Sequence, residues 1–321
     1  MNILITGGLG FIGSNLARRL LKEGHRITLL DSLIPEYGGN LANVLDISGQ
    51  IRINISDIRD PFATLELLKG VELVFNLAGQ TSHADSMTDP FTDLDINARS
   101  QLVLLESIRK VCPDAVVVFA STRQVYGRPK YLPVDESHPI RPVDVNGVNK
   151  MAGEHFHLLY HDVYGIRTTA LRLTNTYGPG MRVKDARQTF LGIWLRNLLM
   201  TEPILVFGDG KQVRDFNYVD DVVDALIRAS GTPACYGRAF NLGSSEVVDL
   251  STLAERLCGL KSGASWQLIP FPLERRVIDI GDYYSNYSLA TELLGWQPTV
   301  CLEDGLRRTV DYYRQHLTAY L

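Results

Sequence analysis

The sequence predicts an α/β protein in which helices cover both faces of a doubly wound parallel sheet. Short apolar segments alternate with helical patterns through the first half of the 321 residues, which is typical of βαβ units. A glycine-rich turn at residues 7–13 follows the first segment, and Asp31 ends the second. A strand, a glycine-rich turn, a helix and a second strand with a terminal acid together indicate a dinucleotide-binding Rossmann fold.

The remaining elements are predicted from hydrophobic periodicity and turn residues. Strands are expected at 2–6, 26–31, 51–55, 73–77, 115–121 and 168–173, and helices at 11–24, 61–69, 90–111 and 144–164. After Asn175 the alternation loosens, and further helices are expected at 186–201, 220–229, 250–260 and 302–316. We therefore expect residues 1–175 to form an NAD-binding domain, with 214–243 contributing to it. Residues 176–321 should form a smaller mixed α/β region that binds substrate.

Composition excludes several classes of function. A net charge of −4 with 21% charged residues gives no basic face for nucleic acid. No apolar run approaches the ~20 residues of a membrane span, and no signal peptide is expected. The four cysteines, Cys112, Cys235, Cys258 and Cys301, form no CxxC pair. We expect them to be buried thiols of a cytoplasmic protein, without a metal site.

Three of the four glycines in the turn have a predicted task. Gly7 permits the tight turn, Gly10 lets the backbone approach a pyrophosphate, and Gly13 lets the helix pack against the sheet. The first helical residues, Phe11 and Ile12, then present free N–H groups and a partial positive charge to the phosphates.

Asp31 predicts which dinucleotide binds. Its carboxylate can accept both adenosine ribose hydroxyls and would repel a 2′-phosphate, which favours NAD over NADP. A structural turn with a solvated Asp31 is the alternative. Asp57 and Ile58 follow the third predicted strand, where they are expected to contact adenine. Asp57 as the N-cap of the helix at 61–69 is an equally open alternative.

Motifs along the whole chain resemble the extended short-chain dehydrogenase/reductase family, in particular its nucleotide-sugar epimerases and dehydratases. The matching segments are 6–13, 76–79, 121–127, 150–154, 171–180, 207–221, 241–243 and 294–298. The resemblance implies NAD as cofactor, with Leu77, Ala78, Gly79 and Lys150 among its contacts. It also implies a reaction that begins by oxidising C4 of a nucleotide sugar, after which the C5 proton becomes acidic.

The family's catalytic tyrosine is absent. The family places its base in a Tyr-x-x-x-Lys helix, where the two side chains share one face. Here the segment is Asn146-Gly147-Val148-Asn149-Lys150. An amide cannot act as a base near neutral pH, although Asn146 can hydrogen-bond a hydroxyl or a water. Four alternatives are open: Lys150 replaces the tyrosine, directly or through water; another group does so; the chain binds a nucleotide sugar without turnover; or residue 146 is an engineered substitution.

The second catalytic segment also departs from the pattern. The resemblance assigns Thr122 a hydrogen bond to the C4 oxygen. The next two residues, an Asp-Glu acid and base pair in 4,6-dehydratases, are Arg123-Gln124 here. His83 lies in the loop that borders the sugar in this family and could supply the missing proton transfer. A surface or hydrogen-bonded histidine is an equally open alternative.

The resemblance also implies a nucleotide-sugar site. Ser82 borders the sugar, Asn175 contacts the diphosphate, and Leu205 and Phe207 belong to the segment that cradles the base, commonly uracil. Arg214 resembles the diphosphate clamp, and Arg275 or Arg276 would add a second guanidinium, a group that binds phosphates through paired hydrogen bonds. For each arginine, a solvated surface charge is the alternative.

These departures favour an NAD-dependent nucleotide-sugar dehydratase without the usual 4,6 machinery, and a 5,6-elimination would fit; the resemblance implies UDP-N-acetylglucosamine as the substrate. The set is similar to that of the 5,6-dehydratase of tunicamycin-type antibiotic biosynthesis. A UDP-sugar 4-epimerase with a relocated base is the alternative within the family, and a non-catalytic NAD and nucleotide-sugar binding protein is the alternative outside it. We expect a homodimer formed by the helices at 90–111 and 144–164.

Overall fold

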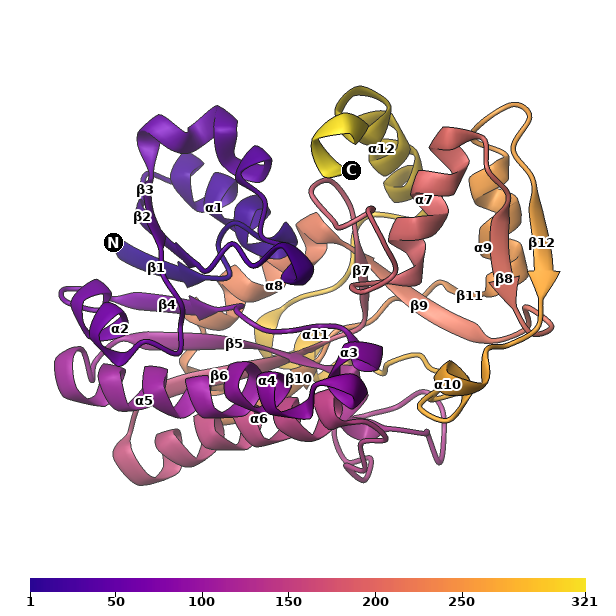
Figure 1. Ribbon diagram of the computed structural model, residues 1–321. Coiled ribbons are helices and arrows are strands. Elements are labelled where there is room, and N and C mark those ends of the chain that lie inside the picture. The colour runs from indigo at the N-terminus through magenta and orange to yellow at the C-terminus, as the bar shows by residue number, and fades with distance from the viewer.

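The computed structural model describes residues 1–321 and every side chain except that of Pro35. Its main sheet has seven strands in the order β10-β6-β5-β4-β1-β2-β3, and every neighbouring pair is parallel. The prediction of a doubly wound parallel sheet is confirmed (Figure 1). The strands are β1 (Asn2–Thr6), β2 (Arg26–Asp31), β3 (Arg52–Ile55), β4 (Leu73–Asn76), β5 (Val116–Thr122), β6 (Arg167–Leu173) and β10 (Arg238–Asn241).

Both faces of this sheet are buried, which explains why its strands are apolar runs rather than alternating ones. Leu4, Val74 and Val117 pack with Leu104 and Ile108 on one face. Neighbouring strand residues point to the opposite face and join a separate, larger core. Helices α2 (Pro61–Leu67), α5 (Ser100–Val111) and α6 (Val145–Tyr164) cover the first face, and α1 (Phe11–Lys22) and α8 (Val219–Gly231) cover the second.

The segment predicted as one helix at 90–111 is continuous but not uniform. It begins as α4 (Pro90–Leu94), continues as a π-helical turn at Asp95–Arg99 and ends as α5. The π-helical turn carries the buried Asn97, which bonds Gln80 and Asp93. A π turn in a helix frequently marks a functional position. Before α4 lies α3 (His83–Thr88), a segment that was expected to be a loop. Its six residues are too few to show a periodic pattern.

The second half contains small sheets that the sequence did not predict. Strands β11 (Val247–Asp249), β9 (Val213–Tyr218) and β7 (Asn175–Tyr177) form one sheet, and β12 (Trp266–Ile269) pairs with β8 (Ile204–Phe207) in another. Their helices are α7 (Phe190–Met200), α9 (Leu250–Cys258), α10 (Leu273–Arg276), α11 (Ser288–Leu294) and α12 (Leu302–His316). The predicted helix at 186–201 begins four residues later, because Thr189 caps it through Leu191 N. In Figure 1 these elements lie on the side away from the N-terminus.

The two halves of the chain share structure. Strand β10 adds to the edge of the main sheet beside β6, and α8 packs against α1. The proposed division at residue 175 therefore stays a prediction about function rather than a break in the core, whose larger cluster contains residues from both halves.

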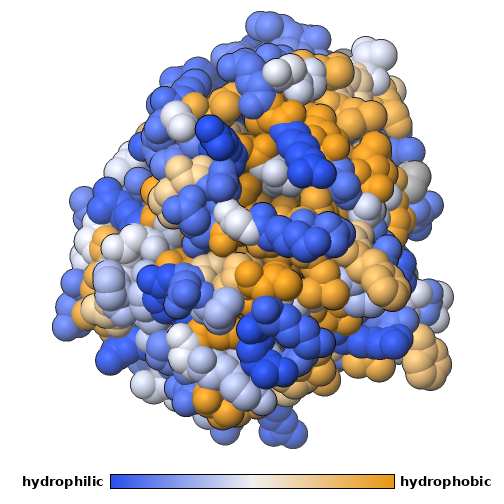
Figure 2. Space-filling model, turned by 90° about the vertical axis from the view of Figure 1, so that its left-hand side faces the viewer, coloured by the Kyte–Doolittle hydropathy of each residue, from blue (hydrophilic) through white to orange (hydrophobic). Residues whose placement is uncertain are grey.

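The exposure of side chains at the surface corrects the prediction about the cysteines. Cys112 and Cys235 are buried, but Cys258 is half-buried and Cys301 is exposed, so the prediction of four buried thiols is wrong for these two. No helix of the described chain is both long and apolar enough to cross a membrane. Figure 2 shows one face on which hydrophobic side chains lie among charged ones. Exposed hydrophobic residues on α4 and α6 include Phe91, Leu94, Leu159 and Val163.

Candidate active site

A cavity of about 850 Å³ lies at the carboxyl ends of the parallel strands, between the main sheet and the smaller sheets. This is where open α/β sheets bind ligands. It extends from the glycine-rich turn, past the ends of β4 and β5, to α10. The cavity brings together nearly all the residues predicted for the site: Gly7, Gly10, Phe11, Ile12, Gly13, Asp31, Asp57, Ile58, Leu77, Ala78, Gly79, Ser82, His83, Thr122, Asn146, Lys150, Asn175, Leu205, Phe207, Arg214 and Arg275.

The glycine-rich turn has no room for side chains. Gly7 has a φ of +66°, and a Cβ there would lie 2.9 Å from Ala78 N. A Cβ on Gly13 would collide with Gly7 O. No side chain caps the N-terminus of α1, and its first turn holds no acidic residue. The first N–H groups of this helix therefore face the cavity with their partial positive charge unopposed, which fits a diphosphate.

Asp31 lies at the end of β2 with its carboxylate fixed by the backbone. Oδ2 accepts a hydrogen bond from Leu9 N at 3.0 Å and Oδ1 accepts one from Leu33 N at 2.9 Å. Burial raises the pKa of this carboxyl, and the two backbone bonds oppose the change. Each carboxylate oxygen retains a lone pair, so the group can still accept hydroxyl hydrogens from a ribose.

Asp57 is held by Arg59 and does not cap a helix. Arg59 Nη2 lies 2.7 Å from Asp57 Oδ2 and lowers the pKa of that carboxyl. The N-cap of α2 is Asp60, which accepts from Phe62 N and Ala63 N. The capping alternative for Asp57 is therefore wrong, and both Asp57 and Ile58 line the cavity.

Lys150 is a buried cation on the wall of the cavity. Its side chain projects from α6 and its Nζ donates to Ala120 O at 3.3 Å. Burial lowers the pKa of Lys150 to about 8, and Asp93 acts in the opposite direction. Thr122 stands at the end of β5, where its Oγ1 accepts from Gln124 N at 3.2 Å and its O–H is left to donate. An amine that is partly neutral near pH 8 can accept a proton.

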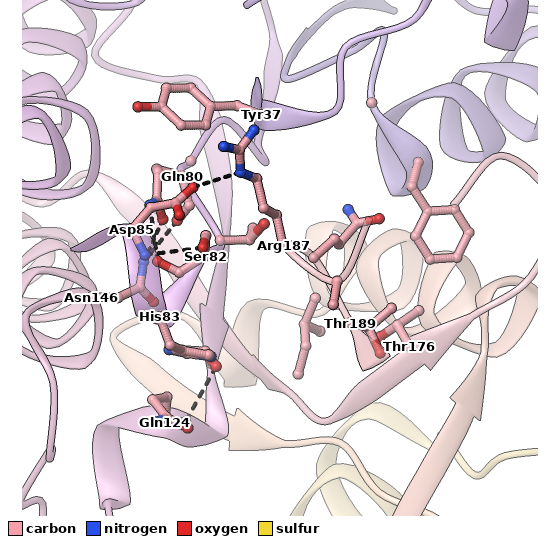
Figure 3. Close-up of a pocket in the computed structure, with 18 of the residues that line it drawn as sticks. Tyr37, Gln80, Ser82, His83, Asp85, Gln124, Asn146, Thr176, Arg187 and Thr189 are labelled. Atoms are coloured by element: carbon pink, nitrogen blue, oxygen red, sulfur yellow. Dashed lines mark hydrogen bonds and ion pairs between the residues drawn. The ribbon is translucent and has the colours of Figure 1, made fainter. Parts of the chain in front are cut away.

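Asn146 shares the cavity face of α6 with Lys150, but its amide nitrogen is fully used within the protein. Nδ2 has two hydrogens and three acceptors, namely Gln80 O at 2.8 Å, Gln80 Oε1 at 3.2 Å and Asp93 Oδ2 at 3.0 Å. Figure 3 shows the bonds to Gln80 on the wall of the cavity. The predicted hydrogen bond between Asn146 and a substrate hydroxyl or a water would therefore have to use the amide oxygen as acceptor.

His83 is neither a free surface residue nor a core residue. It begins α3, and its Nδ1 lies 3.0 Å from Oδ2 of Asp144, the N-cap of α6. Gln124 Nε2 donates to the same oxygen at 2.7 Å. Burial alone would raise the pKa of Asp144, but its contacts with His83, Gly147 and Gln124 lower it. No sequence pattern predicts Asp144 as the partner of His83, because 61 positions separate the two residues.

Two of the arginines predicted to bind a diphosphate line the cavity, from β9 and α10. Arg214 is buried and donates to Val213 O at 2.8 Å and to Gly281 O. Burial lowers its pKa to about 10, and the nearby Arg123 adds to the effect. Arg275 lies over the ring of Phe207 at 5.5 Å. Arg276 is exposed outside the cavity lining, so Arg275 is the one of the predicted pair that the structure brings to the site.

Sequence reasoning missed Arg123 as a site residue, since it was considered only as a missing acid. Its Nη2 donates to Asn175 Oδ1 at 3.1 Å, and its guanidinium lies 5.3 Å from the centre of the Tyr283 ring. Asn175 in turn donates to Asp215 O at 3.0 Å. Adjacent Arg-Gln in place of Asp-Glu was the only available signal.

A bridge between the two halves was also missed. Arg187 Nε lies 3.0 Å from Asp85 Oδ2, which joins the segment before α7 to α3 (Figure 3). Tyr37 lies near them on the cavity wall. Ser82 serves as the N-cap of α3 by accepting from Asp85 N at 3.2 Å. Among the described residues, no cluster of His, Cys, Asp or Glu could hold a metal ion.

Comparison with known proteins gives one consistent result. Residues 3–243 match the NAD dependent epimerase/dehydratase family. The chain is 34% identical over 318 residues to a putative UDP-glucose 4-epimerase of Methanocaldococcus jannaschii, covering 98% of this chain and 99% of the relative. It is 33% identical over 315 residues to a UDP-glucose 4-epimerase of Mycolicibacterium smegmatis, with the same coverage of each chain.

Solved structures agree. A UDP-glucose 4-epimerase of Thermotoga maritima with UDP-glucose superposes with a TM-score of 0.88 at 31% identity, covering 99% of this chain and 100% of that one. The dTDP-glucose 4,6-dehydratase DesIV of Streptomyces venezuelae, with NAD bound, gives a TM-score of 0.90 at 26% identity, covering 99% and 98%.

The Asp31 carboxylate can be tested by cofactor preference. Asp31→Asn should weaken NAD binding about tenfold or more and narrow the preference for NAD over NADP. The substitution removes a charged acceptor, whose hydrogen bonds contribute roughly 1.5–3 kcal/mol, and the charge that opposes a 2′-phosphate. Titration calorimetry with both cofactors measures the effect. Asp60→Asn, at a helix cap outside the cavity, is the control; an unchanged preference in Asp31→Asn would contradict the assignment.

Proposed function

Because the chain belongs to the NAD dependent epimerase/dehydratase family and its cofactor is NAD, we propose that it dehydrates a nucleotide sugar after transient oxidation at C4. The proposed substrate is UDP-N-acetylglucosamine and the proposed reaction is loss of water across C5 and C6. The observation that carries the proposal is the buried Lys150 amine beside Thr122, on a wall from which the usual tyrosine is absent.

Lys150 is the proposed proton acceptor for the C4 hydroxyl. Bound NAD supplies reversible oxidation of the sugar carbon, and the protein supplies placement and proton transfer. The Nζ is shielded from solvent and has one protein acceptor, Ala120 O, among the described residues. It therefore has lone-pair capacity when neutral. Thr122 can donate to the C4 oxygen from the adjacent strand end.

The substrate side supports a nucleoside diphosphate. Arg214 and Arg275 supply two guanidinium groups to the cavity lining, and Asn175, at the start of β7, donates to the backbone oxygen of Asp215, the residue after Arg214. Leu205 and Phe207 on β8 are the proposed contacts of the base. Relatives and solved neighbours named for UDP-sugars favour uracil.

Elimination across C5 and C6 is favoured by what stands beside Thr122. Arg123 and Gln124 carry no carboxylate for a 4,6-elimination, while His83 lines the cavity and pairs with the buried Asp144. The set is again similar to that of the antibiotic-pathway 5,6-dehydratase. A second candidate, 4-epimerisation of a UDP-sugar, is favoured by the two relatives at 34% and 33% identity that are named UDP-glucose 4-epimerases.

A homodimer and a cytoplasmic location remain part of the proposal. The exposed Leu159 and Val163 on α6 and Phe91 and Leu94 on α4 would be covered if these helices paired across a two-fold axis. Such pairing would place the contact on the opposite side of α6 from the cavity residues Asn146 and Lys150 without involving either.

Proton NMR of UDP-N-acetylglucosamine incubated with the protein in D2O tests the reaction. We expect new alkene signals from C6 and loss of the C5 signal, because elimination converts C5 and C6 to an exocyclic double bond. Lys150→Met should abolish the change while leaving UDP binding by calorimetry intact. Inversion at C4 alone would establish the epimerase, and unchanged spectra over a panel of UDP-sugars would support a binding protein instead.

The pH profile tests Lys150 as the acceptor. Because burial lowers the Lys150 pKa to about 8, the neutral amine dominates above that pH and becomes about tenfold scarcer with each unit below it. We expect kcat/KM to rise about fiftyfold between pH 6 and pH 8 and to level off about one pH unit higher. A profile that is flat or falling over this range would contradict the role, and Lys150→Arg, which cannot deprotonate, should remove the rising limb.

A further inference from the structure

His83, which lines the cavity, and the buried Asp144 form a pair that orients the imidazole ring. His83 Nδ1 lies 3.0 Å from Asp144 Oδ2. The Asp144 side chain has no exposed surface, whereas that of His83 is 39% exposed. The Nδ1 atom itself is shielded from solvent and makes no hydrogen bond of standard geometry, so its contact with Asp144 Oδ2 is that of an ion pair. The exposed part of the ring is therefore the opposite edge, which carries Nε2, and His83 lines the cavity.

The carboxylate determines which nitrogen carries hydrogen. An ionised carboxylate only accepts hydrogen bonds, so it favours Nδ1–H and leaves the Nε2 lone pair free. Asp144 is itself fixed, since Oδ1 accepts from Gly147 N at 2.6 Å as the N-cap of α6, and Oδ2 also accepts from Gln124 at 2.7 Å. The pair is thus held by three elements: α3, α6 and the 3₁₀ turn at Arg123–Tyr126.

The neighbouring charges leave Asp144 as the carboxylate that acts on His83. Asp85, the other acid of α3, is paired with Arg187 at 3.0 Å. Gln124 places an amide where a carboxylate would otherwise be expected, and that amide binds Asp144. The carboxylate absent from Gln124 is therefore supplied by Asp144, which Gln124 contacts. Asp144 also contacts the imidazole of His83, which lines the cavity.

We infer that His83, oriented by Asp144, carries the C5 proton during elimination. The inference rests on the proposed function, in which C4 is already a ketone. The C5–H bond breaks, its electron pair forms the C4–C5 enolate, and the proton passes to His83 Nε2. The enolate then forms the C5–C6 double bond and expels the C6 hydroxyl, which takes the same proton and leaves as water. His83 returns to its neutral form, so protons and electrons balance.

Replacement of the imidazole separates this step from oxidation at C4. His83→Gln should lower alkene formation on the order of 10²–10⁴-fold, the usual contribution of a general base. It should still allow the rise in near-ultraviolet absorbance of the reduced cofactor when UDP-N-acetylglucosamine is added. His155→Gln, an exposed histidine on the same helix as Asp144, is the matched control and should match wild type in both measurements.

Alkene formation at the wild-type rate in His83→Gln would overturn the inference and leave the proposed function standing. Loss of cofactor reduction together with alkene formation in this variant would also overturn it, since the histidine would then act before the C5 step. A wild-type protein that forms no alkene would refute both the proposed function and the inference.

The imidazole can also be examined without turnover. Nitrogen-15 NMR of histidine-labelled protein, assigned with His83→Gln, should show the Nδ1–H tautomer at His83. Asp144→Asn keeps an N-cap acceptor for α6 but can present an amide N–H to the ring. It should shift the hydrogen to Nε2 and lower alkene formation as His83→Gln does. An Nε2–H tautomer in the wild-type protein, or an Asp144→Asn protein with wild-type turnover, would overturn the proposed role of the pair.

Discussion

The hydrogen bonds to the buried carboxylate of Asp93 hold together the part of the cavity wall that contains Asn146 and Lys150. A buried charge is unfavourable unless hydrogen bonds replace its hydration. Three amide donors do so here: Asn97 at 3.0 Å, Asn146 at 3.0 Å and Asn149 at 2.8 Å. Asn97 comes from the π-helical turn and the other two from α6. Asp93 therefore joins the helical segment after β4 to the helix that carries Lys150, and it opposes the lowering of the Lys150 pKa.

The same network explains the absent tyrosine. Asn97 and Asn146 both donate to Gln80 O, which fixes the loop that leads into His83. A residue at position 146 that bonds inward in this way does not have to be a base. The proton chemistry can then lie with Lys150 on one side and with His83 and Asp144 on the other, while Arg214 and Arg275 hold the far end of the cavity. In the proposed reaction, oxidation, elimination and recognition are carried out by separate residues of one cavity.

The parts predictable from the sequence are those in which local pattern and fold agree. Strands buried on both faces are apolar runs, and the glycine turn and Asp31 are recognised by their order along the chain. The short strands β7 and β11 have three residues each, too few for a period to show. Helix α3 was missed for the same reason. The partners of His83, Asn146 and Arg123 depend on contacts between distant segments, and spacing along the chain carries no signal for them.

The claim that Asn146 is a structural donor rather than a vacant base position is tested most directly by Asn146→Tyr. The measurement is the turnover rate of this variant on the nucleotide sugar that the wild-type protein converts. The larger ring would remove a donor from Asp93 and Gln80 and overpack a buried position, at a cost of roughly 1–3 kcal/mol. Turnover should therefore fall. A clear rise in turnover would show that only the tyrosine was missing and would contradict the account.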